Sequence, residues 1–407
     1  MTRRKLPIGI QTFARIRDEG YYYVDKTPLV ARLAEGGGAY FLSRPRRFGK
    51  TLFLDTLAEA FAGNRVIFEG GDAAVRLGAD PKAAERPRLY LADHWDWGQR
   101  HPVIRISFVE GRCERRDELD RAIRRQLRTN AERLGVTLTE PEDIVGSFSE
   151  LIDRAANRHN ARAVVLVDEY DKPILDNLTE PDVARQMREA LRSLYSVLKG
   201  RDADLRFVFL TGVSKFSKVS IFSGLNHLND ITLDAHYATI CGYTEGDLDT
   251  VFAPEFEAAA AEGKPLDRDE VRRWYNGYAW DGEPVYNPFD VLLLFDKREY
   301  RAWWFETGTP TFLIEWLKSR QFFTPQLEGL YADDQLLSAF DVDAIEPEAM
   351  LWQTGYLTVE KSLSTPKGVV FALRLPNQEV RTALNEALAA AWAPGARLVA
   401  NDAALTL

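Results

Sequence analysis

The sequence is poor in the residues that build disulfide-rich or metal-stabilised folds. It has two cysteines, Cys113 and Cys241, and five histidines in 407 residues. Two cysteines make no disulfide framework, and their spacing is not that of a metal site. We therefore expect both to be small buried side chains in a protein of the reducing cytoplasm.

Long apolar runs, repeats and low-complexity segments are also missing. The basic start Met1-Thr2-Arg3-Arg4-Lys5 is not followed by an apolar stretch, and no segment approaches the roughly 18 apolar residues of a membrane-spanning helix. The net charge of −9 argues against a protein that coats nucleic acid or membranes through its overall field. We therefore expect a globular, cytoplasmic protein with no membrane partner.

Positive charge is nevertheless concentrated at one end. Residues 1–50 carry 11 basic and four acidic side chains. Three of the basic residues, Arg44, Arg46 and Arg47, lie just before Phe48-Gly49-Lys50-Thr51-Leu52, in one segment with it. This segment ends like a phosphate-binding loop, in which backbone N–H groups and a lysine bind phosphates and a hydroxyl binds Mg²⁺. Arg44 stands where the standard pattern has its first glycine, so the interpretation needs support from elsewhere.

The flanking segments provide the order strand, loop, helix that such a loop requires. Residues 39–42 form a short apolar run that predicts a buried strand. From Lys50 to about Gly63 apolar side chains recur with helical spacing. A helix is also expected over 27–33, because Thr27 and Pro28 form a typical helix start.

Three further runs rich in β-branched or aromatic residues alternate with long helical stretches. The runs are 103–108, 164–167 and 207–210, and the helices are expected over 118–134 and 181–198. This alternation indicates a parallel α/β sheet flanked by helices, as in a P-loop NTPase, over residues 1–238. Dense aromatics and an Asp281-Gly282 turn signal predict a smaller, mostly helical domain with hairpins over 239–375. A tail is expected over 376–407.

Acidic residues at the end of the run 164–167 give a second nucleotide-binding signal. Asp168 is placed to hold Mg²⁺ together with Thr51, and Glu169 to orient and deprotonate an attacking water. The order and spacing of the loop and this strand end are those of a P-loop ATPase. Lys50 is then expected to bind the β- and γ-phosphates and to take part in catalysis.

Several polar residues have two possible interpretations. Thr211 or Ser214 could sense the γ-phosphate at the end of the next strand, or could cap a turn. Asp171 and Lys172 could extend the metal site or cap the following helix. The three loop arginines could be solvated, or at least one could face the triphosphate and stabilise charge during phosphoryl transfer.

Together these motifs resemble a bacterial and archaeal family of AAA-ATPase-like proteins, whose members usually carry a C-terminal PD-(D/E)xK nuclease domain. The resemblance covers nearly the whole chain. It is carried by Tyr23-Val24-Asp25-Lys26-Thr27, Arg44-Pro45-Arg46-Arg47-Phe48-Gly49-Lys50-Thr51, Val167-Asp168-Glu169-Tyr170-Asp171-Lys172-Pro173, Thr211-Gly212-Val213-Ser214-Lys215-Phe216-Ser217, Phe222-Ser223-Gly224-Leu225-Asn226, Tyr275-Asn276-Gly277-Tyr278, Tyr286-Asn287-Pro288, Gln353-Thr354-Gly355-Tyr356-Leu357-Thr358 and Pro376-Asn377-Gln378-Glu379-Val380. In that family the arginine-rich loop is the usual form, so Arg44 is a family feature.

The sequence departs from the family after Val380. Only 27 residues follow it, and a nuclease of this type needs an acidic residue and a (D/E)-x-Lys pair on adjacent strands. The available pairs, Asp80-Pro81-Lys82 and Glu262-Gly263-Lys264, do not follow apolar strands. We therefore expect this chain to lack the nuclease.

The leading hypothesis is an AAA-like ATPase that binds ATP and Mg²⁺ and drives or switches a process involving nucleic acid, defence or mobile elements. Its partner would be a nucleic acid or a protein, and the oligomeric state is left open. One alternative is a nucleotide-binding regulatory module with negligible turnover. Another is an anion- or nucleic-acid-binding scaffold that uses the basic N-terminal region. The aromatic motifs 275–278 and 303–305 could stack nucleobases or pack the second domain.

Overall fold

The computed structural model describes residues 3–215, 228–308, 327, 329–333, 337, 340–341, 344–366 and 368–392. Three expectations concern residues outside this part. They are the motif Phe222-Ser223-Gly224-Leu225-Asn226, the last two residues, Phe216-Ser217, of the motif that begins at Thr211, and the end of the expected tail at 393–407.

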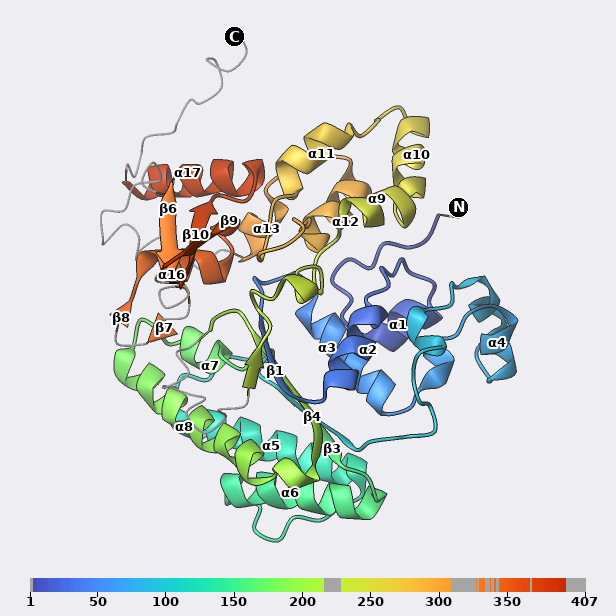
Figure 1. Ribbon diagram of the computed structural model, residues 1–407, viewed down its shortest axis with the longest axis vertical. Helices are drawn as coiled ribbons and strands as arrows, with labels where there is room; N and C mark the ends of the chain where they lie inside the picture. The colour runs from blue at the N-terminus through green and yellow to red at the C-terminus, as the bar shows by residue number, and fades with distance from the viewer. Residues whose placement is uncertain are drawn as a thin grey trace.

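A five-stranded parallel sheet forms the centre of the N-terminal part (Figure 1). Its strands are β1 (Gly38–Ser43), β2 (Val103–Ser107), β3 (Ala163–Asp168), β4 (Leu205–Gly212) and β5 (Leu228–Asp230). The spatial order is β2-β3-β4-β1-β5, and every neighbouring pair is parallel. Strand β4 therefore lies between the strand that precedes the loop and the strand that ends in Asp168. The expected α/β class and four expected strands are confirmed.

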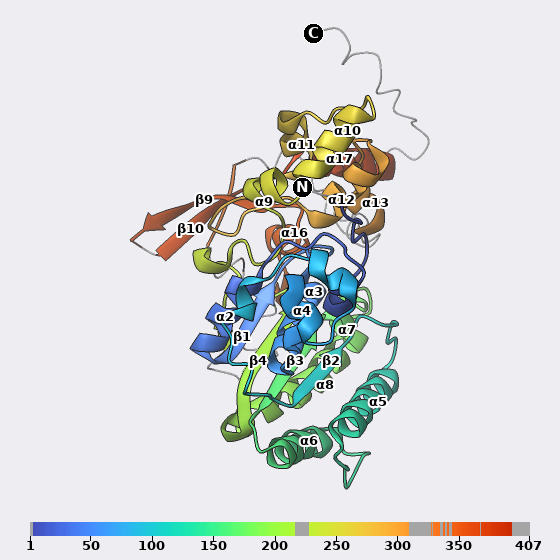
Figure 2. The ribbon, with the colours of Figure 1, turned by 90° about the vertical axis from the view of Figure 1, so that its right-hand side faces the viewer.

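Helices cover both faces of this sheet, as Figures 1 and 2 show. The helices are α1 (Phe13–Asp18), α2 (Thr27–Gly36) and α3 (Lys50–Phe61) on one side, and α5 (Arg116–Leu134), α6 (Ile144–His159) and α8 (Pro181–Gly200) on the other. All six residues of β3 are buried, as expected for a strand covered on both faces. The carboxyl ends of the strands point toward the C-terminal part of the chain, where open α/β sheets bind ligands.

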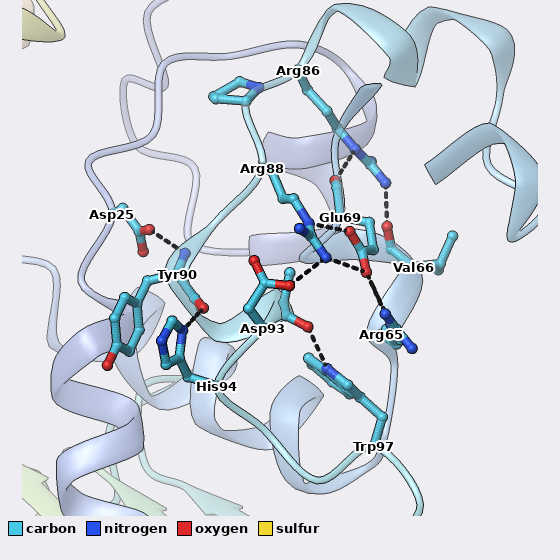
Figure 3. Close-up of polar contacts among 12 residues, drawn as sticks. Asp25, Arg65, Val66, Glu69, Arg86, Arg88, Tyr90, Asp93, His94 and Trp97 are labelled. Atoms are coloured by element: carbon cyan, nitrogen blue, oxygen red, sulfur yellow. Dashed lines mark hydrogen bonds and ion pairs between the residues drawn. The ribbon is translucent and has the colours of Figure 1, made fainter. Parts of the chain in front are cut away.

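The connection from α3 to β2 forms a separate surface lobe. It contains η1 (Arg65–Ile67), α4 (Gly71–Arg76), η2 (Pro81–Glu85) and η3 (Tyr90–Ala92). A buried carboxylate, Glu69, pairs with Arg65 at 2.9 Å and with Arg88 at 2.6 Å (Figure 3). Asp80 accepts a hydrogen bond from the backbone of Lys82 and so caps the start of η2.

The C-terminal part combines short helices with small antiparallel sheets. Its elements, with two short helices that precede it, are α7 (Lys172–Leu175), η4 (Asp202–Asp204), η5 (Ala235–Tyr237), α9 (Glu245–Thr250), α10 (Ala253–Ala261), α11 (Arg268–Tyr275), α12 (Pro288–Lys297), α13 (Trp303–Gly308), β6 (Leu330–Asp333), β7 (Phe340–Asp341), β8 (Ala344–Ile345), α16 (Pro347–Thr354), β9 (Thr358–Thr365), β10 (Gly368–Arg374) and α17 (Gln378–Trp392). Strands β6, β10 and β9 form one sheet, and β7 pairs with β8. The Asp281-Gly282 turn joins Tyr278 to Val285 through an antiparallel bridge, as expected.

The N-terminal and C-terminal parts share their hydrophobic cores. The larger core includes Phe13 and the central strands, and it continues to Trp304 and Leu384. A second core packs Tyr22 against residues of α9, α10 and α12. The segment expected to be a tail begins with α17, and Glu379 in this helix is completely buried. Residues 376–392 are therefore part of the packed structure.

No helix in the described ranges is both long enough and apolar enough to cross a membrane.

Candidate nucleotide-binding site

The loop between β1 and α3 brings several backbone N–H groups close together at the start of α3. Gly49 starts α3 with φ +94°, in the left-handed region that favours glycine. Within the described part of the chain, the backbone N–H groups of residues 49–52 have no hydrogen-bond acceptor. Such first-turn N–H groups, together with the helix dipole, favour anions. The loop therefore fits a phosphate group.

Lys50 lies over the loop with its charge inside the protein. Its Nζ donates to the carbonyl oxygens of Arg44 and Pro45, both at 3.0 Å. The same Nζ lies 3.5 Å from Oε1 of Glu169. The ammonium group is thus held between the loop and the end of β3, the two segments that sequence analysis paired.

Thr51 and Asp168 meet directly, although 117 positions separate them in the sequence. The hydroxyl of Thr51 donates to Oδ2 of Asp168 at 2.7 Å. Oδ1 of Asp168 is buried and has no hydrogen-bond partner among the described residues. Burial first, and then the charge of Glu169, raise the pKa of Asp168 to about 6. A hydroxyl beside a carboxylate with an uncompensated oxygen fits Mg²⁺, which takes few protein ligands and keeps several waters.

Glu169 begins the turn that follows β3. Its φ is +51°, a conformation that costs a non-glycine residue of the order of 1–3 kcal/mol and is common at functional sites. Its side chain lines the same pocket as Lys50 and Thr51. The strained backbone therefore directs a carboxylate into the space above the loop.

Asp171 has a role that sequence analysis did not assign. Its carboxylate accepts hydrogen bonds from the backbone N–H of Val213 at 3.1 Å and from that of Ser214 at 2.6 Å. It makes no capping bond to α7. Burial, with the charge of Glu169, raises the pKa of Asp171 to about 6. Asp171 thus connects the turn after β3 to the turn after β4. The ammonium of Lys172 forms an ion pair with Asp176 at 2.6 Å.

The two expected γ-phosphate sensors do not line the pocket. Thr211 is fully buried, and its hydroxyl donates to the carbonyl oxygen of Leu42 on β1 at 3.0 Å. The hydroxyl of Ser214 donates to Asp171. Both hydroxyls thus hold neighbouring strands and turns together, which differs from the expected contact with phosphate. The sequence motif located the turn correctly, but it could not give the direction of these side chains.

Arg44 points into the core instead of into the pocket. Its guanidinium donates to the carbonyl oxygens of Ser43, Thr232 and Tyr237 at 2.8, 2.9 and 3.2 Å. It also lies 4.0 Å from the ring of Trp280. Burial lowers the pKa of Arg44 to about 10. The expectation that the Arg44 side chain binds nucleotide is thus corrected, because these contacts hold its guanidinium in the interior.

The other two loop arginines do line the pocket. Arg47 has φ +68°, and its guanidinium lies 4.3 Å from the ring of Phe289. Burial lowers the pKa of Arg47, and the nearby carboxyl group of Asp290 opposes this shift. Arg46 is partly exposed, and its carbonyl oxygen accepts a hydrogen bond from Trp304.

The pocket has a volume of about 440 Å³ and is lined by segments that lie far apart in the sequence. Loop residues 46–47 and 49–52, with Glu169, form its polar wall. A second wall comes from Pro7, residues 9–11, Tyr243, Pro288 and Phe289. Sequence analysis did not assign this second wall. Nothing local in the sequence indicates that the start of α12 at Pro288 faces the loop.

Comparisons with known proteins show which family the chain resembles. A sequence profile of the AAA-ATPase-like family, described as a predicted AAA-ATPase, matches residues 7–222. The "uncharacterized protein in vnfD 5′ region" of Azotobacter chroococcum mcd 1 is 54% identical over 395 residues, which is 97% of this chain and 72% of that protein. No solved structure gives a significant match. The chain therefore belongs to the AAA-ATPase-like family.

Proposed function

We propose that this chain binds ATP with Mg²⁺ in the pocket above the loop and hydrolyses it. The observation that supports this proposal most directly is the 2.7 Å contact between Thr51 and Asp168 beside the ammonium of Lys50. It places a hydroxyl, a buried carboxylate and a cation at the start of a helix whose first N–H groups have no acceptor among the described residues. Few binding partners other than a magnesium-bound phosphate chain require this combination.

Each residue has a distinct task in this proposal. The N–H groups of residues 49–52 and the ammonium of Lys50 bind the β- and γ-phosphates. Thr51 and Asp168 hold Mg²⁺, which when bound neutralises the charge that develops on the phosphates. Glu169 orients the attacking water and accepts its proton. Arg46 and Arg47 place positive charge at the mouth of the pocket.

The base would occupy the side of the pocket away from Glu169. A smaller apolar cavity of about 70 Å³ adjoins the main pocket and shares Gly49, Leu52, Tyr243 and Pro288 with it. Aromatic and apolar side chains of this kind stack on nucleobases without strong base preference. The geometry therefore supports a nucleoside triphosphate better than inorganic phosphate alone.

Isothermal titration with Mg–ATP tests the binding site. We expect Lys50→Ala to weaken binding at least tenfold, because one charge-assisted contact to phosphate is lost. Lys199→Ala is a matched control, because Lys199 is exposed on α8 and does not line the pocket. Circular dichroism would verify that the Lys50 variant is folded. Equal binding by the wild type and a folded Lys50→Ala variant would reject this site.

Phosphate release separates hydrolysis from simple binding. We expect Glu169→Gln to keep its affinity for Mg–ATP and to lose turnover by roughly 10²- to 10⁴-fold, the usual contribution of a general base. If the wild-type chain released no phosphate at any protein concentration, a nucleotide-binding regulatory module would be the better description.

We further propose that the ATP cycle drives or switches a process on nucleic acid, because the resembling family usually joins this ATPase to a nuclease domain. Fluorescence anisotropy with single- and double-stranded oligonucleotides, with and without Mg–ATPγS, tests this proposal. Oligonucleotide binding that changes with the nucleotide would support it. The absence of binding in both states would reject it and leave a protein partner.

A further inference from the structure

The C-terminal part of the chain covers the outer side of the phosphate-binding loop. The ring of Phe48 packs edge-on against Tyr278, with ring centres 4.7 Å apart, and against Trp280 at 5.5 Å. Gly355 lies so close to Pro45 that an added Cβ would be 2.7 Å from the proline ring. The loop is therefore held between the pocket on one side and aromatic residues on the other.

Trp304, in the described part of this cover, makes a side-chain hydrogen bond to the backbone of the loop. Its Nε1 donates to the carbonyl oxygen of Arg46 at 3.1 Å. Its ring is 1% exposed and packs near Tyr356, with ring centres 5.3 Å apart. A tryptophan in such a position joins a large packed surface to one directed polar contact.

This contact sets the direction of an N–H group inside the loop. The carbonyl of Arg46 and the N–H of Arg47 belong to one peptide plane, and the described chain contains no cis peptide. In a trans peptide the two groups point in opposite directions. Because the carbonyl points outward to Trp304, the N–H of Arg47 points to the opposite side of the loop, where the pocket lies.

Glu379 of α17 fixes the backbone that carries Trp304. Its Oε1 accepts hydrogen bonds from the N–H of Trp304 at 2.9 Å and from that of Phe305 at 3.4 Å. Glu379 is completely buried. A movement of the carboxylate would therefore move the first turn of α13 and the indole with it.

The same carboxylate is linked to the second arginine of the pocket. Asp290 is completely buried, and burial together with the nearby charge of Glu379 raises the pKa of its carboxyl group well above the usual range. Asp290 lies on α12 next to Phe289, and the guanidinium of Arg47 lies over the ring of Phe289 in a cation–π contact. Two separate paths thus join α17 to the loop, one through Trp304 and one through α12.

We propose that Trp304 and Glu379 position the phosphate-binding loop and transmit its occupancy to helix α17. This inference rests on the proposed nucleotide binding. Phosphate that binds the inward N–H of Arg47 pulls on the peptide plane whose carbonyl is held by Trp304. The loop cannot adjust to the ligand without a change at α13, and α13 is bonded to α17. Trp304 is a positioning residue in this scheme and does not touch the nucleotide.

Two tryptophan variants test the first step. We expect Trp304→Phe to weaken Mg–ATPγS binding about fivefold, the effect of one neutral hydrogen bond. Trp97→Phe is the matched control, because Nε1 of Trp97 donates to the carbonyl oxygen of Ala92, also at 3.1 Å, and lines no part of the pocket (Figure 3). Equal affinities of Trp304→Phe, Trp97→Phe and the wild type would overturn the positioning role.

Two variants of Glu379 test the link to α17. We expect Glu379→Ala to weaken binding as much as Trp304→Phe does, because the first turn of α13 loses its acceptor. Glu379→Gln should bind like the wild type, because its amide oxygen accepts the same two N–H bonds from Trp304 and Phe305. A merely structural role would affect thermal stability in both variants without this difference in affinity. Full affinity in a folded Glu379→Ala variant would overturn the link.

Hydrogen–deuterium exchange of residues 378–392 measures the transmission itself. We expect Mg–ATPγS to slow exchange in α17 of the wild type and of Trp97→Phe, and to leave it unchanged in Trp304→Phe at saturating nucleotide. A wild-type chain that binds Mg–ATPγS without any change in α17 would reject this inference alone. A wild-type chain that does not bind Mg–ATPγS would reject the proposed function and this inference with it.

Discussion

Asp168 has a buried carboxyl group that suits Mg²⁺ but opposes folding when no metal is bound. Its pKa is raised from the ordinary value of 3.8 to about 6 by burial and by Glu169. Between these two values the folded state binds more protons than the unfolded state does. The free energy of unfolding contributed by this group therefore falls as the pH rises from about 4 to 6, and stays low at higher pH.

We accordingly expect Asp168→Asn to stabilise the metal-free protein at pH 8 and not at pH 3.5. Two pKa units at about 1.4 kcal/mol each limit the gain to about 3 kcal/mol. The same change should abolish Mg²⁺-dependent binding of ATP. Urea unfolding in EDTA at both pH values measures the gain, with the exposed Asp202→Asn as the control. A variant that is no more stable than the wild type at pH 8 would contradict the burial argument.

Arg44 occupies the glycine position of a standard phosphate-binding loop, yet its side chain stabilises the core. We expect Arg44→Gly, which restores the standard pattern, to lower the free energy of unfolding by at least about 3 kcal/mol. It leaves three carbonyl oxygens and the face of Trp280 without their partner. Arg46→Gly, at a partly exposed position, should cost no more than about 1 kcal/mol. Chemical denaturation of both variants compares them, and an Arg44→Gly variant as stable as Arg46→Gly would show that these contacts contribute little.

At the residue scale, sequence reasoning located the site but not the direction of every side chain. Lys50, Thr51, Asp168 and Glu169 could be placed together, because the carboxyl ends of parallel strands meet at one edge of the sheet. The direction of Arg44 depends on carbonyl groups almost 200 positions later in the chain, at 188 and 193 residues' separation. No local pattern contains that information.

At the scale of elements, helix α5 completes the open edge of the sheet. Strand β2 is the last strand in the order, so its outer N–H and C=O groups have no neighbouring strand. Asn130 accepts from the N–H of Arg105 at 3.0 Å and donates to its carbonyl oxygen at 2.7 Å. One turn earlier, Gln126 accepts from the N–H of Ser107 at 2.7 Å. The two side chains thus make hydrogen bonds to the outer edge of β2 that a sixth strand would otherwise make.

We expect Asn130→Ala to lower the free energy of unfolding by about 2 kcal/mol, because a partly buried N–H and a partly buried carbonyl of Arg105 lose their partners. Thr129→Ala, at the neighbouring exposed position, should change it by less than about 0.5 kcal/mol. Thermal and urea unfolding of both variants measure the difference. Similar small effects in the two variants would mean that water replaces the amide at the edge of the sheet.

The elements that could be predicted are those that bury one face, because such a face gives apolar residues a regular spacing in the sequence. The central strands and α3, α5 and α8 follow clear apolar periods and were expected within a few residues of their bounds. Strand β9 was not expected, because six of its eight residues are exposed and its sequence shows no alternation. Helix α12 extends over 10 residues, and its later turns pack in the second core.

At the scale of the whole molecule, the shared cores argue against two independently folding domains. The proposed boundary near residue 238 divides both cores, since Tyr22 packs with Phe252, and Phe48 packs with Tyr278 and Trp280. A fragment that ends at this boundary would expose the apolar groups around the phosphate-binding loop. It would also lose the hydrogen bond from Trp304 that orients the loop.

We therefore expect scanning calorimetry of the whole chain to show one cooperative transition, with equal calorimetric and van't Hoff enthalpies. Saturating Mg–ATPγS should move this entire transition upward, by mass action on the folded state. Two transitions, of which nucleotide moves only the first, would contradict this expectation, because they would mean that the part with the candidate site unfolds without the C-terminal cover. A single transition follows from the contacts themselves, since the backbone of the candidate site is held on its outer side by Trp304 and Gly355, from the C-terminal part of the chain.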